Sequence, residues 1–130
     1  MAARRILVVD DDVDFLEEMT DILKSYGFEP IAVNDSAAVQ DIVRLLKPDA
    51  ILLDVKMSGL TGFQVKDRLS QDLETMGIPV IAVTGSYGGK DRRYLMNTLG
   101  VGNCIMKPFA PQELVDAIES ILVHGGEKQI

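Results

Sequence analysis

Acidic residues directly follow two apolar runs of the sequence. Three consecutive aspartates, Asp10, Asp11 and Asp12, come after the first run, and Asp54 comes after a later one. Carboxylates that are packed together repel one another, and a cation relieves that repulsion. Mg²⁺ prefers hard oxygen ligands, and a carboxylate can itself be the nucleophile that forms an aspartyl phosphate. The pattern therefore indicates a magnesium-dependent phosphoryl-transfer site.

A hydroxyl group and an ammonium group stand at the ends of two further apolar runs. Thr84 follows the fourth run and Lys107 follows the fifth. Phosphoryl transfer depends more on neutralising charge on the equatorial oxygens than on acid–base chemistry. A metal ion, a lysine and a small hydroxyl together supply that neutralisation, so both residues are candidates for the same site.

Five short apolar segments are predicted to be the strands that position these groups. Most of them are rich in Ile, Val and Leu and do not alternate with polar residues, which is typical of parallel strands covered on both faces. The predicted strands are Ile6–Val9, Pro30–Val33, Ala50–Leu53, Pro79–Val83 and Asn103–Met106.

Segments with helical spacing separate the predicted strands. Ser36 is predicted to be the N-cap of the second helix, and Gly27 to be the C-cap glycine of the first. The five predicted helices are Asp14–Tyr26, Ser36 to the residue before Pro48, Thr61–Leu73, a segment from Gly88 and Gly89 to Leu99, and one that begins at Ala110. Strict alternation of strand and helix predicts a parallel sheet with helices on both faces. Ligands of such sheets bind at the carboxyl ends of the strands, where the candidate residues stand.

Four segments together carry a family resemblance. They are ILVVDDDVDFLE, AILLDVKMSGLTGF, PVIAVTGS and CIMKPF. In order and spacing they resemble the four signature blocks of response-regulator receiver domains, over nearly the whole chain. The resemblance implies a flavodoxin-like, doubly wound α/β fold, in which a five-stranded parallel sheet of order 2-1-3-4-5 is flanked by five helices. The receiver domain is expected to span residues 1–124, with residues 125–130 as a C-terminal tail or the start of a linker.

The resemblance also implies a role for each candidate residue of the metal site. Asp54 is the expected phosphoacceptor. Asp10 and Asp11 are the expected acidic pair that holds Mg²⁺ together with Asp54, and Asp11 is the favoured direct ligand of the pair. The backbone carbonyl of Lys56, two residues past the acceptor, is expected to be a further ligand.

The remaining candidates are expected to act on the phosphoryl group. The resemblance implies that Thr84 forms a hydrogen bond with the phosphoryl group and that Lys107 forms an ion pair with it. Lys107–Pro108 resembles the Lys-Pro of the family, in which the peptide bond is often cis. The expected function is to accept a phosphoryl group from a histidine kinase or a histidine phosphotransfer protein and to signal, by a change of conformation, to a downstream effector. Such a protein catalyses only its own phosphorylation and dephosphorylation and is not a turnover enzyme.

The sequence departs from the family pattern at three positions. Met57-Ser58-Gly59 stands where Met-Pro-Gly is usual, and Gly85 stands where alanine is most common. Cys104 occupies the position, three residues before the lysine, where the family carries Tyr or Phe. Because that aromatic ring helps to couple phosphorylation to a surface change, we expect a smaller and more local change here. Cys104 itself is expected to be a small, packed strand residue rather than a redox sensor.

Two other functions fit parts of the pattern. The first four apolar residues followed by Asp-x-Asp also fit haloacid-dehalogenase-like phosphatases, with Asp10 as the nucleophile and Asp12 as the acid/base. That interpretation leaves Asp54 unexplained, and the chain lacks the later acidic pair of that family. The second alternative is a degenerate receiver that acts only as a binding module. The complete acidic set, Thr84 and Lys107 argue against it.

Bulk properties narrow the range of partners and compartments. The net charge of −7 argues against a general nucleic-acid binder. One cysteine permits no internal disulfide. The apolar run at Ile6–Val9 is too short for a signal-peptide core, and no stretch approaches the roughly 18 apolar residues of a membrane span. A soluble, cytoplasmic protein without membrane insertion is expected, and a homodimer is left open.

Overall fold

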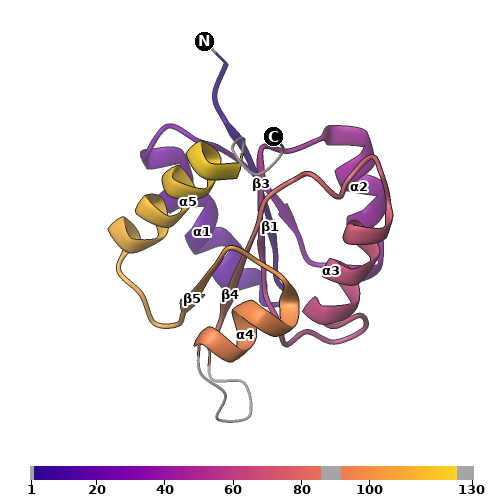
Figure 1. Ribbon diagram of the computed structural model, residues 1–130. Coiled ribbons are helices and arrows are strands. Elements are labelled where there is room, and N and C mark those ends of the chain that lie inside the picture. The colour runs from indigo at the N-terminus through magenta and orange to yellow at the C-terminus, as the bar shows by residue number, and fades with distance from the viewer. Residues whose placement is uncertain (1, 86–91, 126–130) are drawn as a thin grey trace.

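The structure, a computed structural model, describes residues 2–85 and 92–125 (Figure 1). The strands are β1 (Arg5–Val9), β2 (Glu29–Val33), β3 (Ala50–Leu53), β4 (Val80–Thr84) and β5 (Asn103–Met106). The helices are α1 (Val13–Ser25), the short 3₁₀ helix η1 (Ser36–Ala38), α2 (Val39–Leu46), α3 (Gly62–Gln71), α4 (Arg92–Leu99) and α5 (Pro111–Gly125). The strand bounds differ by no more than one residue from those predicted. The predicted start of the fourth helix at Gly88 and Gly89 lies outside the described residues.

The five strands form one parallel sheet in the order β2-β1-β3-β4-β5, which confirms the predicted fold. Its register brings the ends of the two central strands together. Val9, the last residue of β1, pairs with Val33 of β2 and with Leu53 of β3. The residues that follow, Asp10 and Asp54, therefore leave neighbouring strands at the same level.

Two hydrophobic layers cover the sheet, one on each face. Alternate residues of β1 show the division: Leu7 and Val9 belong to the layer under α2, α3 and α4, whereas Ile6 and Val8 belong to the layer under α1 and α5. Figure 1 shows α1 and α5 to the left of the sheet and α2 and α3 to its right. Because both faces of every central strand are buried, the strands are apolar throughout and the sequence does not alternate.

Local capping explains where α1 begins and ends and where α3 begins. Asp12 is the N-cap of α1, and its carboxylate accepts from the backbone N–H groups of Asp14 and Phe15. Thr61 begins α3 with a capping box, in which its hydroxyl and the Gln64 side chain satisfy each other's backbone N–H. Gly27 follows α1 with φ of +88°, as predicted for a C-cap glycine.

The predicted N-cap role of Ser36 is wrong. The carboxylate of Asp35 caps this segment by accepting from the Ala37 backbone N–H at 3.0 Å, and Ser36 is the first residue of η1. The Ser36 side chain is buried instead, and its hydroxyl bonds to the loop that follows β3. A carboxylate one residue earlier in the chain competes for the same cap, because Asp and Ser are about equally good N-caps.

Gly62 sets how closely α3 approaches the backbone that follows β3. Its N–H donates to the carbonyl of Val55 at 2.8 Å. A Cβ at this position would lie 2.5 Å from the carbonyl oxygen of Asp54 and 2.6 Å from the Cα of Val55. These neighbours are backbone atoms and cannot rotate away. The first turn of α3 thus requires glycine.

We predict that Gly62→Ala lowers the free energy of unfolding by about 1–3 kcal/mol, because the added methyl overpacks against backbone. Gly85→Ala is the matched control, since no heavy atom of the described residues lies within 4 Å of the Cβ it would add. It should change stability by less than about 0.5 kcal/mol. Denaturant unfolding of the two variants and the parent measures both effects. Equal stability of the two variants would contradict the close approach of α3.

Candidate functional site

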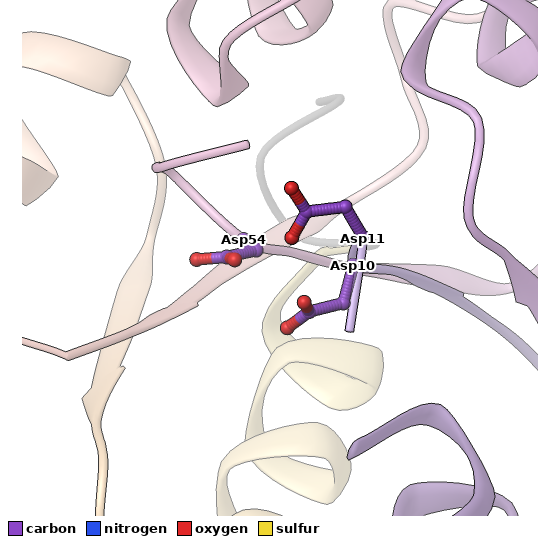
Figure 2. Close-up of side chains that lie close together, drawn as sticks. All are labelled: Asp10, Asp11 and Asp54. Atoms are coloured by element: carbon purple, nitrogen blue, oxygen red, sulfur yellow. The ribbon is translucent and has the colours of Figure 1, made fainter. Parts of the chain in front are cut away.

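Three carboxylates converge at the carboxyl edge of the sheet. Asp10 follows β1 and Asp54 follows β3, and both side chains are buried, whereas Asp11 is exposed. One oxygen of each carboxylate lies within 4.8 Å of the other two. Figure 2 shows all three side chains projecting into the same space. The structure thus brings together the residues that the sequence indicated for a metal site.

The electrostatics of Asp54 favour a nearby cation. Burial, and after it the negative charge of Asp10, raise the pKa of Asp54 from its usual 3.8 to about 6. Lys107, the backbone N–H of Lys56 and the hydroxyl of Thr84 oppose that rise in pKa. Their combined effect does not compensate for burial and repulsion. The groups around Asp54 therefore do not fully stabilise its ionised form, and a bound cation would do so.

Asp11 is held differently from its neighbours. Ser58 donates to Asp11 Oδ2 twice, from its backbone N–H at 2.9 Å and from its hydroxyl at 3.1 Å. The backbone bond is the main reason that the pKa of Asp11 is lowered, although desolvation opposes it. Asp11 thus stays an anionic oxygen ligand, suited to a hard cation.

Lys107 lies inside the site rather than in solvent. Its Nζ forms an ion pair with Asp10 Oδ2 at 2.9 Å and stands 3.9 Å from the centroid of the Phe15 ring. Phe15 in turn meets Phe109 edge-on. The Lys107 backbone N–H donates to the carbonyl of Thr84 at 2.8 Å. These contacts fix the ammonium group beside the acidic cluster.

The ends of β3, β4 and β5 position the remaining groups at this edge of the sheet. Thr84 ends β4 and is buried, and its hydroxyl bonds toward Asp54. Lys56 donates its backbone N–H to Asp54 Oδ1 at 3.4 Å. The Lys107–Pro108 peptide bond is cis. The five other residues that the sequence singled out for the site therefore lie around Asp54: Asp10, Asp11, Lys56, Thr84 and Lys107.

Cys104 lies away from the carboxylates, in the core. Its side chain is fully buried in the layer under α2, α3 and α4, next to the β4 residue Ala82 in register. Burial raises the pKa of its thiol. A thiol that is buried and protonated is inert, which agrees with the predicted packing role.

Asp12 does not face the other carboxylates. Its side chain is engaged in capping α1, as described above. A phosphatase that used Asp10 as nucleophile would need Asp12 as its acid/base beside the substrate. The capping geometry therefore gives no support to the dehalogenase-like alternative.

The donor set fits Mg²⁺. Three carboxylates provide hard oxygen atoms at close quarters, and two of them repel each other in its absence. Asp10, Asp11 and Asp54 would hold the ion, with the backbone carbonyl of Lys56 as a further oxygen donor.

Three contacts at the site were not anticipated from the sequence. They are the cation–π contact of Phe15, the double donation by Ser58, and the bonds from Ser36 to the loop that carries Ser58. The replacement of the usual proline by Ser58 was the one available signal, because serine adds two donors that proline lacks.

Comparison with known proteins identifies the family. The sequence model of the response regulator receiver domain matches residues 6–119. The chain therefore belongs to the response regulator receiver domain family, and the match does not favour the phosphatase alternative.

Among the residues that the structure describes, no helix is both long and apolar enough to cross a membrane.

Relatives with DNA-binding or regulatory names share this sequence over about half of their own length. The chain is 35% identical over 125 residues to the DNA-binding response regulator MtrA of Mycobacterium tuberculosis, covering 96% of this chain and 53% of that protein. It is 35% identical over 120 residues to the phosphate regulon transcriptional regulatory protein PhoB of Escherichia coli, covering 92% and 52%. Among solved structures, the receiver domain of a signal transduction histidine kinase from Syntrophus aciditrophicus is similar with a TM-score of 0.81 and 26% identity, covering 93% and 91%.

We predict that the stability of the metal-free protein depends on pH through Asp54. The pKa of Asp54 in the folded protein, about 6, lies above the usual 3.8. The contribution of protonated Asp54 to the free energy of unfolding is therefore fully present below pH 3.8 and is lost as pH rises through 6. Asp54→Asn removes this dependence. In chelator, the variant should therefore gain on the order of 1–3 kcal/mol relative to the parent between about pH 4 and pH 7.

Denaturant unfolding of both proteins across that range provides the measurement, and the difference between them cancels the titration of all other groups. A difference that stays constant with pH would contradict the burial and repulsion of Asp54.

Proposed function

We propose that the chain accepts a phosphoryl group on Asp54 in a Mg²⁺-dependent reaction. The observation that carries this proposal is the buried Asp54 carboxylate, which lies within reach of two other carboxylates and beside Lys107 and Thr84. One Asp54 oxygen attacks the phosphorus atom, a P–O bond forms, and the bond from phosphorus to the donor's leaving group breaks. The leaving group departs with the electron pair of that bond.

The residues around Asp54 serve the charge that develops during transfer. Lys107 is held by Asp10 and Phe15 at the site and neutralises charge on a phosphoryl oxygen. The Thr84 hydroxyl donates a hydrogen bond to another phosphoryl oxygen. When bound, Mg²⁺ neutralises the carboxylates and the incoming phosphoryl oxygens. Asp10, Asp11 and the Lys56 carbonyl would provide its oxygen ligands together with Asp54.

The partner on the donor side is a histidine kinase or a histidine phosphotransfer protein. A phosphohistidine donor supplies the phosphoryl group and leaves as neutral imidazole once it is protonated. The chain then acts on an effector domain or protein downstream. It modifies only itself, without turning over an external substrate, and it works as a soluble cytoplasmic domain over residues 1–124.

The first test concerns the acceptor. Incubation with a small phosphodonor and Mg²⁺ should add one phosphoryl group, detected by intact-protein mass spectrometry. Asp54→Asn should abolish the addition because it removes the only nucleophile that ends β3. Labelling that persists in this variant would refute the assignment. Failure of the parent to label, despite bound Mg²⁺, would favour a binding module, whereas sustained hydrolysis of a phosphomonoester would favour the phosphatase.

The second test concerns the extent of the conformational change. Cys104 is small and buried, so no ring on β5 can move when the phosphoryl group draws Thr84 toward it. A ligand shifts an equilibrium only by its differential affinity for the two states. We therefore predict that beryllofluoride shifts backbone amide signals mainly at Met57–Gly62 and Thr84–Lys90, most of the second segment lying outside the described residues. Shifts of comparable size across Arg92–Leu99 and Leu114–Leu122 would show that coupling persists without a ring.

A further inference from the structure

The loop between β3 and α3 reaches back to the β1–α1 loop through Ser58. Both of the donors that Ser58 carries, its backbone N–H and its hydroxyl, bond the same oxygen, Asp11 Oδ2, at 2.9 and 3.1 Å. The two residues are 47 positions apart in the chain. Two donors on one carboxylate oxygen restrict both side-chain torsions of Asp11 and leave Oδ1 outside these bonds.

Ser36 fastens the same loop from its other side. The Ser36 hydroxyl accepts from the Leu60 backbone N–H at 2.9 Å and donates to the Ser58 carbonyl at 3.4 Å. It also lies 3.2 Å from the place where a Cβ of Gly59 would stand. Ser36 is only 6% exposed, so these bonds are shielded from water. The loop is therefore pinned on both sides of Gly59.

Asp11 depends on this support more than its neighbours do. Asp10 is buried and tied to Lys107 and to the Asp12 backbone N–H, and Asp54 is buried at the end of β3. Asp11 is exposed on a loop. An exposed carboxylate that is free to rotate loses conformational entropy when it binds a cation. Hydrogen bonds from neighbouring groups to that carboxylate restrict it beforehand, so that less entropy is lost on binding.

We propose that Ser58 is a positioning residue that pre-orients Asp11 for a divalent cation, and that Ser36 acts through Ser58 by holding its loop. This inference rests on the proposed function, in which Asp11 is a Mg²⁺ ligand. Removing both Ser58 donors weakens Mg²⁺ binding about tenfold, as is typical of outer partners of metal ligands. Removing only the hydroxyl weakens it less, because the backbone N–H stays.

The test measures Mg²⁺ affinity of the intact chain by calorimetric titration, without any phosphodonor. Ser58→Pro lacks both donors, and proline is the usual residue here in the family, so the loop accepts it. Ser58→Ala keeps the N–H, and Ser58→Thr keeps both donors. The expected order of affinity is parent equal to Ser58→Thr, then Ser58→Ala, then Ser58→Pro. Ser25→Ala, at an exposed hydroxyl at the end of α1, is the control and leaves the affinity unchanged.

A double-mutant cycle tests the role of Ser36. Ser36→Ala alone should weaken Mg²⁺ binding, and should add nothing in the Ser58→Pro background, because its effect passes through Ser58. Unfolding in chelator shows how much each variant loses in stability alone. Additive effects on affinity would overturn the role given to Ser36. If Ser58→Pro fails to fold, the comparison of Ser58→Ala with Ser58→Thr decides, and equal affinities would overturn the role of Ser58.

Asp11→Ala separates this inference from the proposed function. If the parent binds no Mg²⁺, or if Asp11→Ala binds it as the parent does, the proposed metal site itself is wrong. If the parent binds Mg²⁺ and Asp11→Ala weakens binding while Ser58→Pro does not, only the positioning role is overturned. Tighter binding by Ser58→Pro also overturns it, since Ser58 would then compete with the cation.

Discussion

Repulsion between Asp10 and Asp54 is the constraint on which this site depends. The sheet places the two carboxylates at the same level because Val9 and Leu53 are partners in register, and burial prevents water from screening them. Lys107 offsets one charge through its ion pair with Asp10, but the pKa of Asp54 stays raised, to about 6. A site with this imbalance favours positive charge, and the backbone pairing of β1 with β3 keeps the two carboxylates at the same level.

The rest of the fold serves to hold those strand ends in place. A parallel sheet puts the carboxyl ends of β1, β3, β4 and β5 at one edge, which is why residues far apart in the chain surround one carboxylate. Helices on both faces bury every residue of β3 and β4 and all of β1 beyond Arg5. Gly62 brings α3 against the backbone of Asp54 and Val55, closer than any other residue type permits. The backbone of Asp54 is thus fixed from its own strand and from the helix that follows.

Most of this arrangement could be predicted from the sequence because it follows from periodic patterns. Continuous apolar runs located every strand to within one residue, and polar residues after those runs located the site. The strand order was not accessible in this way, since periodicity does not encode which strands are neighbours, and it came from the family resemblance. Ser36, Ser58 and Phe15 make contacts between loops or across the site, which leave no repeat in the sequence. The cap at Asp35 was missed because two adjacent residues were both good candidates.

The two informative departures from the family pattern act at different distances from the chemistry. Ser58 stands in the loop beside Asp11 and adds two donors to it, so its effect is confined to how the acidic cluster is held. Cys104 lies fully buried on β5, the strand that pairs with β4, which ends at Thr84. It belongs to the hydrophobic layer that also includes Leu95 and Leu99 of α4. A buried thiol occupies that space without a second stable position, because packed interiors leave little room for alternatives. In the proposed function, the residues around Asp54 match the family pattern while β5 lacks the ring at Cys104, so phosphorylation chemistry and signal output are separable properties of this chain.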